Sequence, residues 1–152
     1  MTIDPSDSRS IRRATESDLG RILEIESLSF DTQWDLASFR AAMNDLFLVL
    51  EEREVVGFLS ACCCALAKRA VIMRIAVHPD HRGEGVATRL IAAVLDQLRE
   101  VKVLEVELDV EIVKTGAIAL YEKFGFQRRQ VLTMNDENHE TFLEMTLRLN
   151  SE

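Results

Sequence analysis

The segment VHPDHRGEGVAT, residues 77–88, connects an apolar strand pattern to the clearest helix pattern of the chain. Gly83 and Gly85 lie within it, and glycine permits a tight turn and lets a ligand approach without a Cβ in the way. The helix that follows offers unpaired N–H groups and the positive end of its dipole. Arg82 adds a fixed positive charge beside them. These features predict a site for an anionic group such as a pyrophosphate, although a purely structural turn would show the same glycine spacing.

The residues on either side of this segment predict a strand and a helix. Residues 70–77 are apolar and rich in β-branched side chains, and the run stops at Pro79, which cannot donate to a sheet ladder. Residues 85–101 form a helix, because apolar side chains recur there at helical spacing. The stripe consists of Val86, Leu90, Val94, Leu98 and Val101.

Further patterns extend the prediction to both ends of the chain. Upstream, we expect strands over residues 10–14, 47–50 and 55–64, and helices that end near Ser29 and Asn44. Downstream, we expect strands over 103–110, 126–134 and 141–149 and a helix over 116–124. Early strands that follow one another and later strands that alternate with helices predict an α/β sheet of mixed direction with helices on both faces.

Composition indicates one soluble globular domain. The chain has 152 residues, of which 47% are hydrophobic and 29% are charged. We expect a flexible N-terminal tail over residues 1–9 and a single domain over 10–150. The formal net charge of -8 argues against nucleic-acid binding, which needs a surplus of Lys and Arg. The same charge favours cationic partners such as amines or basic peptides.

The cysteines and histidines show no disulfide or metal pattern. Residues 62–64 are consecutive cysteines, which we expect on a buried strand in a reducing compartment. His78, His81 and His139 have no metal-ligand grouping, so no metal is expected. The N-terminus lacks a signal-peptide pattern, and no apolar run approaches the roughly 18 residues of a membrane span. The sequence therefore predicts a cytoplasmic protein that does not bind a membrane.

Two motifs resemble those of a known family. Residues 74–91, RIAVHPDHRGEGVATRLI, closely resemble the acetyl-coenzyme A motif Arg/Gln-x-x-Gly-x-Gly/Ala of the GCN5-related N-acetyltransferase (GNAT) family, with Arg82, Gly85 and Ala87 at the specified positions. Residues 117–126, AIALYEKFGF, resemble the family's helix and turn beside the pantetheine arm. Within the family, residues 25–39, IESLSFDTQWDLASF, are most similar to the RimI-type ribosomal-protein-alanine N-acetyltransferases.

The resemblance implies a mostly antiparallel sheet of about seven strands and a set of residues that hold acetyl-CoA. Backbone groups of Ile75, Ala76 and Val77 are implied to meet the acetyl and pantetheine portion. The residues implied at the pyrophosphate are Arg82, Gly83, Glu84, Gly85, Val86, Ala87 and Thr88. Lys114 stands where the family has an asparagine, so that asparagine's hydrogen bonds are lost, and a contact from Lys114 to the coenzyme stays open.

The implied reaction is acetyl transfer to a primary amine, which must be neutral to attack. An α-amine, with a pKa of about 7.7–8.0, is neutral in about one molecule in seven at pH 7, whereas a lysine at about 10.4 is neutral in about one in 2,500. A protein N-terminal α-amine therefore needs weaker base assistance. Direct attack is preferred to an acetyl-cysteine intermediate, because no histidine motif lies near residues 62–64 to activate them.

Residues 104–111 supply candidate bases, because the segment alternates apolar and acidic side chains. All its carboxylates then lie on one face, where like charges raise some of their pKa values towards neutrality. The RimI-type resemblance places the general base at Asp109, with Glu107 and Glu111 as alternatives. A merely solvated strand face would show the same pattern.

Tyr121, the single tyrosine of the chain, is implied by the resemblance to be the general acid that protonates the departing coenzyme A sulfur. On sequence alone, a packed amphipathic side chain is the alternative. A backbone N–H within residues 75–77 is expected to meet the oxyanion.

The amine substrate is less well defined by the sequence. Gln130, Val131 and Leu132 stand where RimI-type enzymes carry adjacent tyrosines, and the polar loop 135–140 suits a cationic amine. A small-molecule amine is therefore the alternative to a protein N-terminus, and a non-catalytic acyl-CoA sensor is the alternative from another functional class. Monomer and homodimer are both compatible with the sequence.

Overall fold

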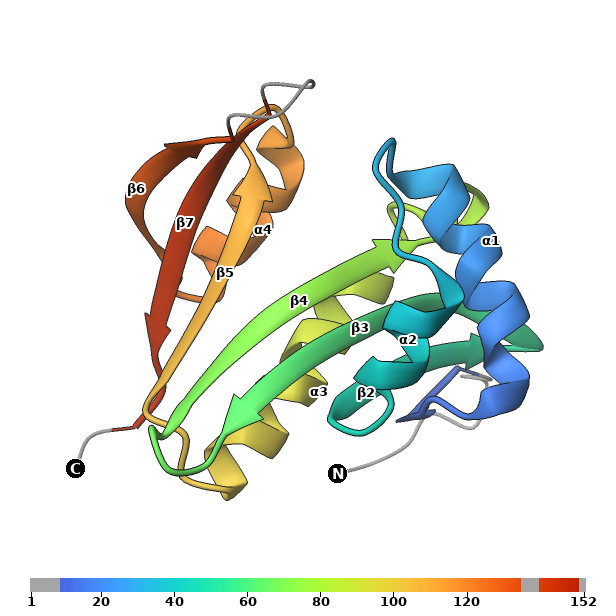
Figure 1. Cartoon of the computed structure of the whole chain (residues 1–152), viewed down its shortest axis with the longest axis horizontal. Coiled ribbons are helices and arrows are strands. Elements are labelled where there is room, and N and C mark those ends of the chain that lie inside the picture. The colour runs from blue at the N-terminus through green and yellow to red at the C-terminus, as the bar shows by residue number, and fades with distance from the viewer. Residues whose placement is uncertain (1–8, 135–139, 151–152) are drawn as a thin grey trace. The chain divides into compact units, whose positions relative to one another are not determined.

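The computed structural model describes residues 9–134 and 140–150. Along these residues, a strand and two α-helices are followed by three consecutive strands, and two further α-helices alternate with the later strands until the chain ends in two consecutive strands (Figure 1). The strands are β1 (Ser10–Arg13), β2 (Leu46–Glu52), β3 (Glu54–Cys64), β4 (Arg69–Val77), β5 (Glu105–Glu111), β6 (Gln127–Thr133) and β7 (Thr141–Arg148). The α-helices are α1 (Leu19–Ser29), α2 (Leu36–Ala42), α3 (Val86–Glu100) and α4 (Thr115–Lys123), and two short 3-10 helices are η1 (Glu16–Asp18) and η2 (Pro79–His81).

The strands form one seven-stranded sheet in the order β1-β2-β3-β4-β5-β7-β6. Strands β4 and β5 pair in parallel, whereas β1 with β2, β2 with β3, β5 with β7 and β6 with β7 pair antiparallel. The prediction of a mixed, mostly antiparallel sheet of about seven strands is confirmed.

The chain divides into two compact units. The first contains Met1–Ala61 and Arg74–Val94, and the second contains Cys62–Met73 and Leu95–Glu152. Strands β3 and β4 and helix α3 contribute residues to both. No helix in the described part of the chain is long and apolar enough to cross a membrane.

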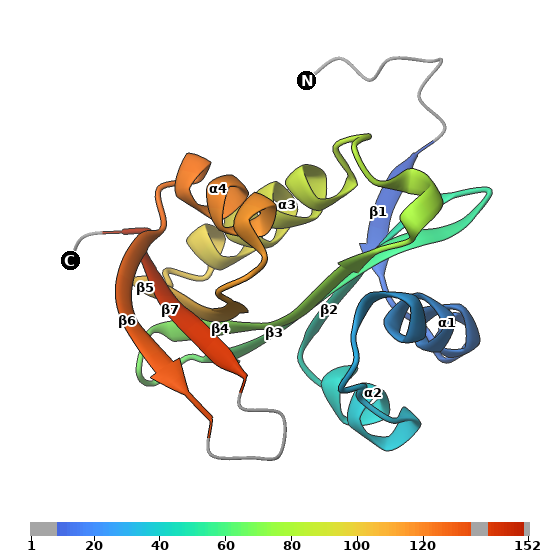
Figure 2. The ribbon, with the colours of Figure 1, turned by 90° about the horizontal axis from the view of Figure 1, so that it is seen from above.

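The core of the first unit lies between α1, α2 and the sheet, and α3 covers the opposite face (Figure 2). Ile22 and Ile25 of α1 are fully buried because they are one helical turn apart and share a face. Phe39 of α2 packs against Phe47 and Phe58, with ring centroids 5.9 and 5.5 Å away. This aromatic cluster fixes α2 on the strands.

The second unit has its own core, and β5 shows the predicted alternation. Val106, Leu108 and Val110 of β5 are buried, whereas the acidic residues between them are half-buried or exposed. Ile118 and Tyr121 of α4 are buried as well. The alternation directs the acidic side chains of β5 to the face opposite its core residues.

Two predictions about side-chain burial are wrong. Cys62 and Cys64 are exposed and Cys63 is half-buried, because β3 runs beyond the core after Ala61. Val101 is 65% exposed, because α3 ends at Glu100 before the stripe reaches it.

Asp18 stabilises the start of α1 through charge-assisted hydrogen bonds. Its carboxylate accepts from the Thr15 N–H at 2.7 Å and from both terminal nitrogens of Arg12 at 2.8 and 2.9 Å. Arg12 therefore lowers the pKa of the Asp18 carboxyl, with Thr15 adding to the effect. We expect Asp18→Asn to lower the free energy of unfolding at pH 7 by about 1.5–3 kcal/mol.

This stabilisation depends on pH in a defined direction. Because the folded pKa of Asp18 lies below its unfolded value, its contribution is complete above the unfolded pKa and is lost as the pH falls through the folded pKa. Urea unfolding at pH 7 and pH 3 should therefore show a smaller gap between parent and variant at pH 3. Asp31→Asn, at an exposed loop position, is the control. An equal gap at both pH values would contradict the ionic role.

Candidate functional site

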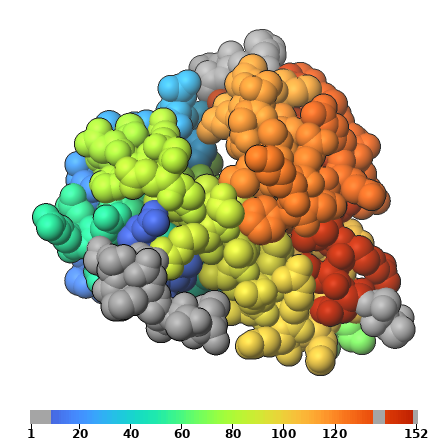
Figure 3. All heavy atoms as spheres, turned by 180° about the vertical axis from the view of Figure 1, so that it is seen from behind, coloured from blue at the N-terminus to red at the C-terminus, as the bar shows by residue number. Residues whose placement is uncertain are grey.

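The turn before α3 adopts the backbone conformation that its glycines permit. Gly83 and Gly85 both have φ = +80°, in the left-handed region that favours glycine. A Cβ built on either would meet no atom within 4 Å, so the backbone conformation and not crowding requires glycine. The space beside this turn is open, and Figure 3 shows the segment at the surface in yellow-green.

Unpaired amides follow directly at the start of α3. The first helical hydrogen bond runs from the Arg89 N–H to the Gly85 carbonyl at 3.0 Å. The N–H groups of Val86, Ala87 and Thr88 precede it and have no acceptor in an earlier turn of the helix. The segment therefore presents amide donors at the positive end of a helix dipole, an arrangement suited to an anion.

Arg82 holds this turn to the end of β4. Its Nε donates to the Val77 carbonyl at 3.1 Å, and a terminal nitrogen donates to the Ser29 hydroxyl at 3.3 Å. The side chain is exposed, so the remaining guanidinium N–H groups stay accessible to an anion. Arg82 thus has a structural role that the sequence did not reveal.

The predicted oxyanion strand, residues 75–77, follows a buried ion pair. Glu26 of α1 is fully buried and forms an ion pair with Arg74 of β4. The Arg74 guanidinium stacks over the Phe30 ring at 3.7 Å and donates to the Thr32 carbonyl at 2.8 Å. Arg74 therefore fixes the segment after α1 beside the strand that carries the predicted backbone donors.

Gly57 of β3 is a position that sequence reasoning missed. A Cβ there would lie 2.7 Å from Val86 Cγ1 and 3.2 Å from the Ala76 carbonyl. Since Val86 begins α3, any larger residue at position 57 would displace the helix start. An isolated glycine within a strand pattern is the signal that could have indicated this close approach.

In the second unit, the acidic face of β5 is partly neutralised by arginines. Arg69 of β4 forms ion pairs with Glu105 at 3.5 Å and Glu107 at 3.0 Å, because the parallel register places Arg69 opposite Glu105. The registered pairing of β4 with β5 ends at Ile72 and Leu108. Asp109 is the first β5 residue beyond it.

Asp109 lacks the ion-pair partner that Glu105 and Glu107 have. Within the described residues, its carboxylate shows no ion pair or side-chain hydrogen bond. Its register partner on β7 is another acid, Glu144, which accepts from Gln130 at 2.9 Å. Partial removal from water, followed by repulsion from Glu144 and Glu107, raises the pKa of Asp109. The structure thus distinguishes Asp109 from Glu107, which the acidic pattern alone could not do.

Tyr121 occupies the buried face of α4. Only 5% of the residue is exposed, and its ring packs edge-on against Phe126 with centroids 5.8 Å apart. Burial raises the pKa of Tyr121 to about 12, so the hydroxyl keeps its proton at neutral pH. Lys114 lies at the N-terminal boundary of this helix, where its carbonyl accepts from the Ile118 N–H at 3.1 Å.

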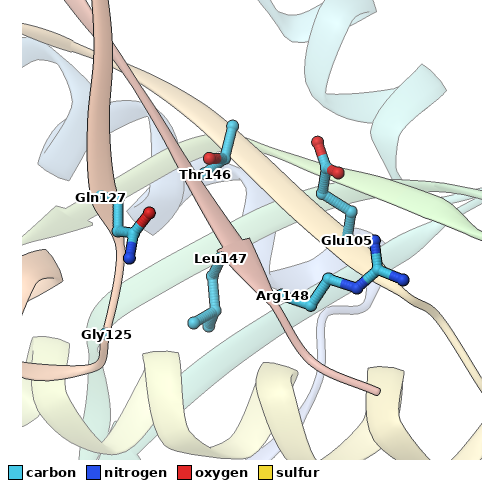
Figure 4. A pocket seen from close by; sticks show the side chains of 6 residues that line it. All are labelled: Glu105, Gly125, Gln127, Thr146, Leu147 and Arg148. Atoms are coloured by element: carbon cyan, nitrogen blue, oxygen red, sulfur yellow. The ribbon is translucent and has the colours of Figure 1, made fainter. Parts of the chain in front are cut away.

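A surface pocket of about 340 Å³ in the second unit contains none of the predicted site residues. It is lined by Glu105, Gly125, Gln127, Thr146, Leu147 and Arg148. Figure 4 shows Leu147 and Thr146 pointing to opposite sides of β7, so the lining is mixed in polarity. On β5 and β7, Asp109 stands opposite Glu144, and Glu105 stands opposite Arg148. The two positions are four residues apart along each strand, so Asp109 lies away from the pocket residues Glu105 and Arg148.

The predicted substrate segments are only partly described. Gln130 and Val131 lie exposed on β6, the edge strand of the sheet, and Leu132 is half-buried. Residues 135–139 of the polar loop, His139 included, lie outside the described residues.

Gly85→Ala tests the conformational requirement of the turn. We expect the free energy of unfolding to fall by about 1 kcal/mol, because alanine is strained at positive φ. Gly20→Ala is the matched control, because Gly20 lies inside α1 and a Cβ added there would meet no atom within 4 Å. This substitution should stabilise the helix by about 1 kcal/mol. Thermal unfolding of both variants measures the difference. Equal stabilisation by the two alanines would contradict the structure of the turn.

Comparison with known proteins identifies relatives along nearly the whole chain. An alanine N-acetyltransferase of ribosomal protein bS18 from Haemophilus ducreyi is 27% identical over 146 residues, covering 91% of this chain and 99% of its own. An N-alpha-acetyltransferase from Saccharolobus solfataricus is 25% identical over 138 residues, covering 81% and 83%.

Solved structures show the same fold. The ribosomal-protein-S18-alanine N-acetyltransferase of Escherichia coli superposes with a TM-score of 0.86 at 23% identity, covering 95% of this chain and 96% of its own. A model of the acetyltransferase (GNAT) family matches residues 11–126, which include both motifs from which the resemblance was recognised. Because this match spans well over half of the sequence, the chain belongs to the acetyltransferase (GNAT) family.

Proposed function

We propose that the protein transfers an acetyl group from acetyl-CoA to the α-amine of a protein N-terminus. The Haemophilus ducreyi and Saccharolobus solfataricus relatives, an alanine N-acetyltransferase of ribosomal protein bS18 and an N-alpha-acetyltransferase, each align over more than four fifths of this chain and support this substrate class. The α-amine also requires weaker base assistance than a lysine side chain. We place the activity in the cytoplasm, where cysteine thiols such as those of residues 62–64 stay reduced.

The donor is held by the turn before α3. Backbone N–H groups of residues 83–88 donate hydrogen bonds to the pyrophosphate at the positive end of the helix dipole, and Arg82 contributes charge. The left-handed glycines leave the approach to these amides open. Lys114 is a further candidate contact for the coenzyme.

The observation that carries the mechanism is that Asp109 has a raised pKa and, among the described residues, no cationic partner, whereas Glu105 and Glu107 are both paired with Arg69. A general base needs a free lone pair and a pKa closer to neutrality. Asp109 meets both requirements. Tyr121, protonated at neutral pH, meets the requirement for a general acid.

The reaction then follows from these roles. Asp109 takes a proton from the ammonium form of the substrate, and the neutral nitrogen attacks the thioester carbonyl. A C–N bond forms, and the carbonyl oxygen becomes an oxyanion that a backbone N–H of residues 75–77 stabilises. The C–S bond breaks as the oxyanion collapses, and Tyr121 donates its proton to the thiolate. Asp109 releases its first proton to solvent and then takes the second proton from the nitrogen, and solvent reprotonates Tyr121.

Thiol release from acetyl-CoA tests the proposal. Peptides that begin with a free alanine or serine should be acetylated, whereas the same peptides with a blocked N-terminus and an internal lysine should not. Mass spectrometry of the product locates the acetyl group on the α-nitrogen. Activity on the blocked peptides alone would overturn the α-amine assignment, and coenzyme binding without thiol release would indicate a non-catalytic sensor.

A small-molecule amine is the second candidate substrate. It is favoured by β6, where Gln130, Val131 and Leu132 replace the adjacent tyrosines that the RimI-type resemblance implies for peptide binding. Polyamines, amino acids and aminoglycoside-like amines in the same thiol-release assay separate the two candidates, because the preferred substrate should have the higher kcat/KM.

A further inference from the structure

Glu52, which is distant in sequence, converges with His81 and Glu84 beside the turn before α3. Glu52 ends β2, His81 ends η2 and Glu84 lies between the two left-handed glycines. One ligand atom from each residue lies within 4.8 Å of the other two. The closest pair is His81 Nδ1 and Glu84 Oε1, at 3.2 Å. The sequence showed no metal-ligand grouping for His81, because Glu52 is far from it along the chain.

Glu52 carries an unsatisfied polar atom. Its Oε2 is buried and has no hydrogen-bond partner, the single such side-chain atom among the residues that the structure describes. A buried carboxylate oxygen without a partner is costly, and an ion that binds it would remove that cost. Glu52 and His81 are half-buried and Glu84 is exposed, so an ion can reach the cluster from solvent.

We propose that Glu52, His81 and Glu84 bind a divalent first-row transition-metal ion of the Zn²⁺ class. Ligand atoms about 2.0–2.2 Å from a common tetrahedral ion lie about 3.3–3.6 Å apart, close to the observed His81–Glu84 separation. The third ligand atom lies within 4.8 Å of the other two, so binding requires the side chains to close in on the ion. The fourth position is left to water.

The ligand types select this class of ion. The imidazole nitrogen favours Zn²⁺, Co²⁺ or Ni²⁺ over Mg²⁺ and Ca²⁺, which prefer oxygen ligands alone. The two carboxylates balance the charge of a divalent ion. The bound ion ties the end of β2 to the turn that contains Gly83 and Gly85, and it is a structural ion that takes no part in acetyl transfer.

Calorimetric titration of the whole protein with Zn²⁺, and with Co²⁺ followed by its visible spectrum, tests the proposal. We expect one ion per chain and a higher melting temperature when the ion is in excess. Glu52→Gln and His81→Gln should each weaken Zn²⁺ binding by about 10- to 100-fold or more. Even the loss of a residue that only hydrogen-bonds to a metal ligand typically has an effect of this size. The melting temperature of metal-free Glu52→Gln should be no lower than that of the parent.

Glu54→Gln is the matched control, because Glu54 is on the same hairpin but pairs with Arg21 at 3.1 Å. It should leave the affinity for Zn²⁺ unchanged. The proposal is wrong if neither ion binds, if binding survives both Glu52→Gln and His81→Gln, or if Co²⁺ shows a thiolate charge-transfer band, which would place the ion on the cysteines at residues 62–64. None of these outcomes depends on acetyltransferase activity.

Discussion

Replacing Tyr121 with phenylalanine is expected to lower kcat by about 100- to 10,000-fold, the usual contribution of a positioned general acid. The change removes one oxygen and leaves a ring that can keep its packing on Phe126. Affinity for acetyl-CoA should therefore stay the same, because the proposed coenzyme contacts come from other residues. A loss confined to kcat is the result expected when an interaction acts only in the transition state.

Steady-state thiol release gives kcat, and calorimetry gives the Kd of acetyl-CoA. Glu122→Gln, on the exposed side of α4, is the control and should change neither, since it loses only a surface ion pair with Arg128. Because the pKa of Tyr121 is about 12, deprotonation of this residue should not lower parent activity below about pH 11. Equal losses in kcat and in coenzyme affinity would contradict the acid role.

The sequence predicted the elements well where the signal was local. Helix α3 was expected over residues 85–101 and spans Val86–Glu100, because its stripe of apolar side chains has helical spacing throughout. The acidic alternation of β5 was likewise visible without knowledge of its neighbours. Val101 is the one residue of the predicted α3 stripe that lies outside the helix. It follows the end of α3, just before Lys102, whose φ of +65° takes the chain out of the helical conformation.

Contacts between distant segments could not be predicted in this way. Glu26 and Arg74 are 48 residues apart, and their ion pair requires a particular packing of α1 against β4. Gly57 shows its role only once α3 is placed against β3. The cysteines at residues 62–64 have an apolar strand sequence, yet the core ends before them and Cys62 and Cys64 are exposed.

The proposal of Asp109 as the base likewise depends partly on a local pattern and partly on contacts between segments that are distant in sequence. The sequence placed acidic residues on one face of β5 but could not rank them from the pattern. The ranking depends on the parallel register that puts Arg69 opposite Glu105 and within reach of Glu107. It depends also on the antiparallel register that puts Glu144 opposite Asp109. Strand order and register, not side-chain type, therefore distinguish Asp109 from Glu105 and Glu107.

Asp109→Asn is expected to lower kcat/KM for an α-amine substrate by about 100-fold at pH 7, the lower range for a general base. The lower range applies because about one α-amine in seven is already neutral at this pH. The defect should shrink as the pH rises past the amine pKa of about 7.7–8.0, where the substrate no longer needs the base. Rates of thiol release from pH 6 to 9 for parent and variant measure this ratio.

The same substitution should not destabilise the protein, which separates a catalytic from a structural role. The raised pKa means that folding disfavours the charged carboxylate, so Asp109 destabilises the folded state above its folded pKa, and this effect vanishes as the pH falls below the unfolded pKa. Asp109→Asn should therefore leave the free energy of unfolding at pH 7 unchanged or raise it. Glu107→Gln is the matched control: it breaks the ion pair with Arg69 and should leave kcat/KM unchanged. If Glu107→Gln shows the larger, pH-dependent loss instead, the base lies at Glu107, and absence of an ion-pair partner is not what selects a base on this strand.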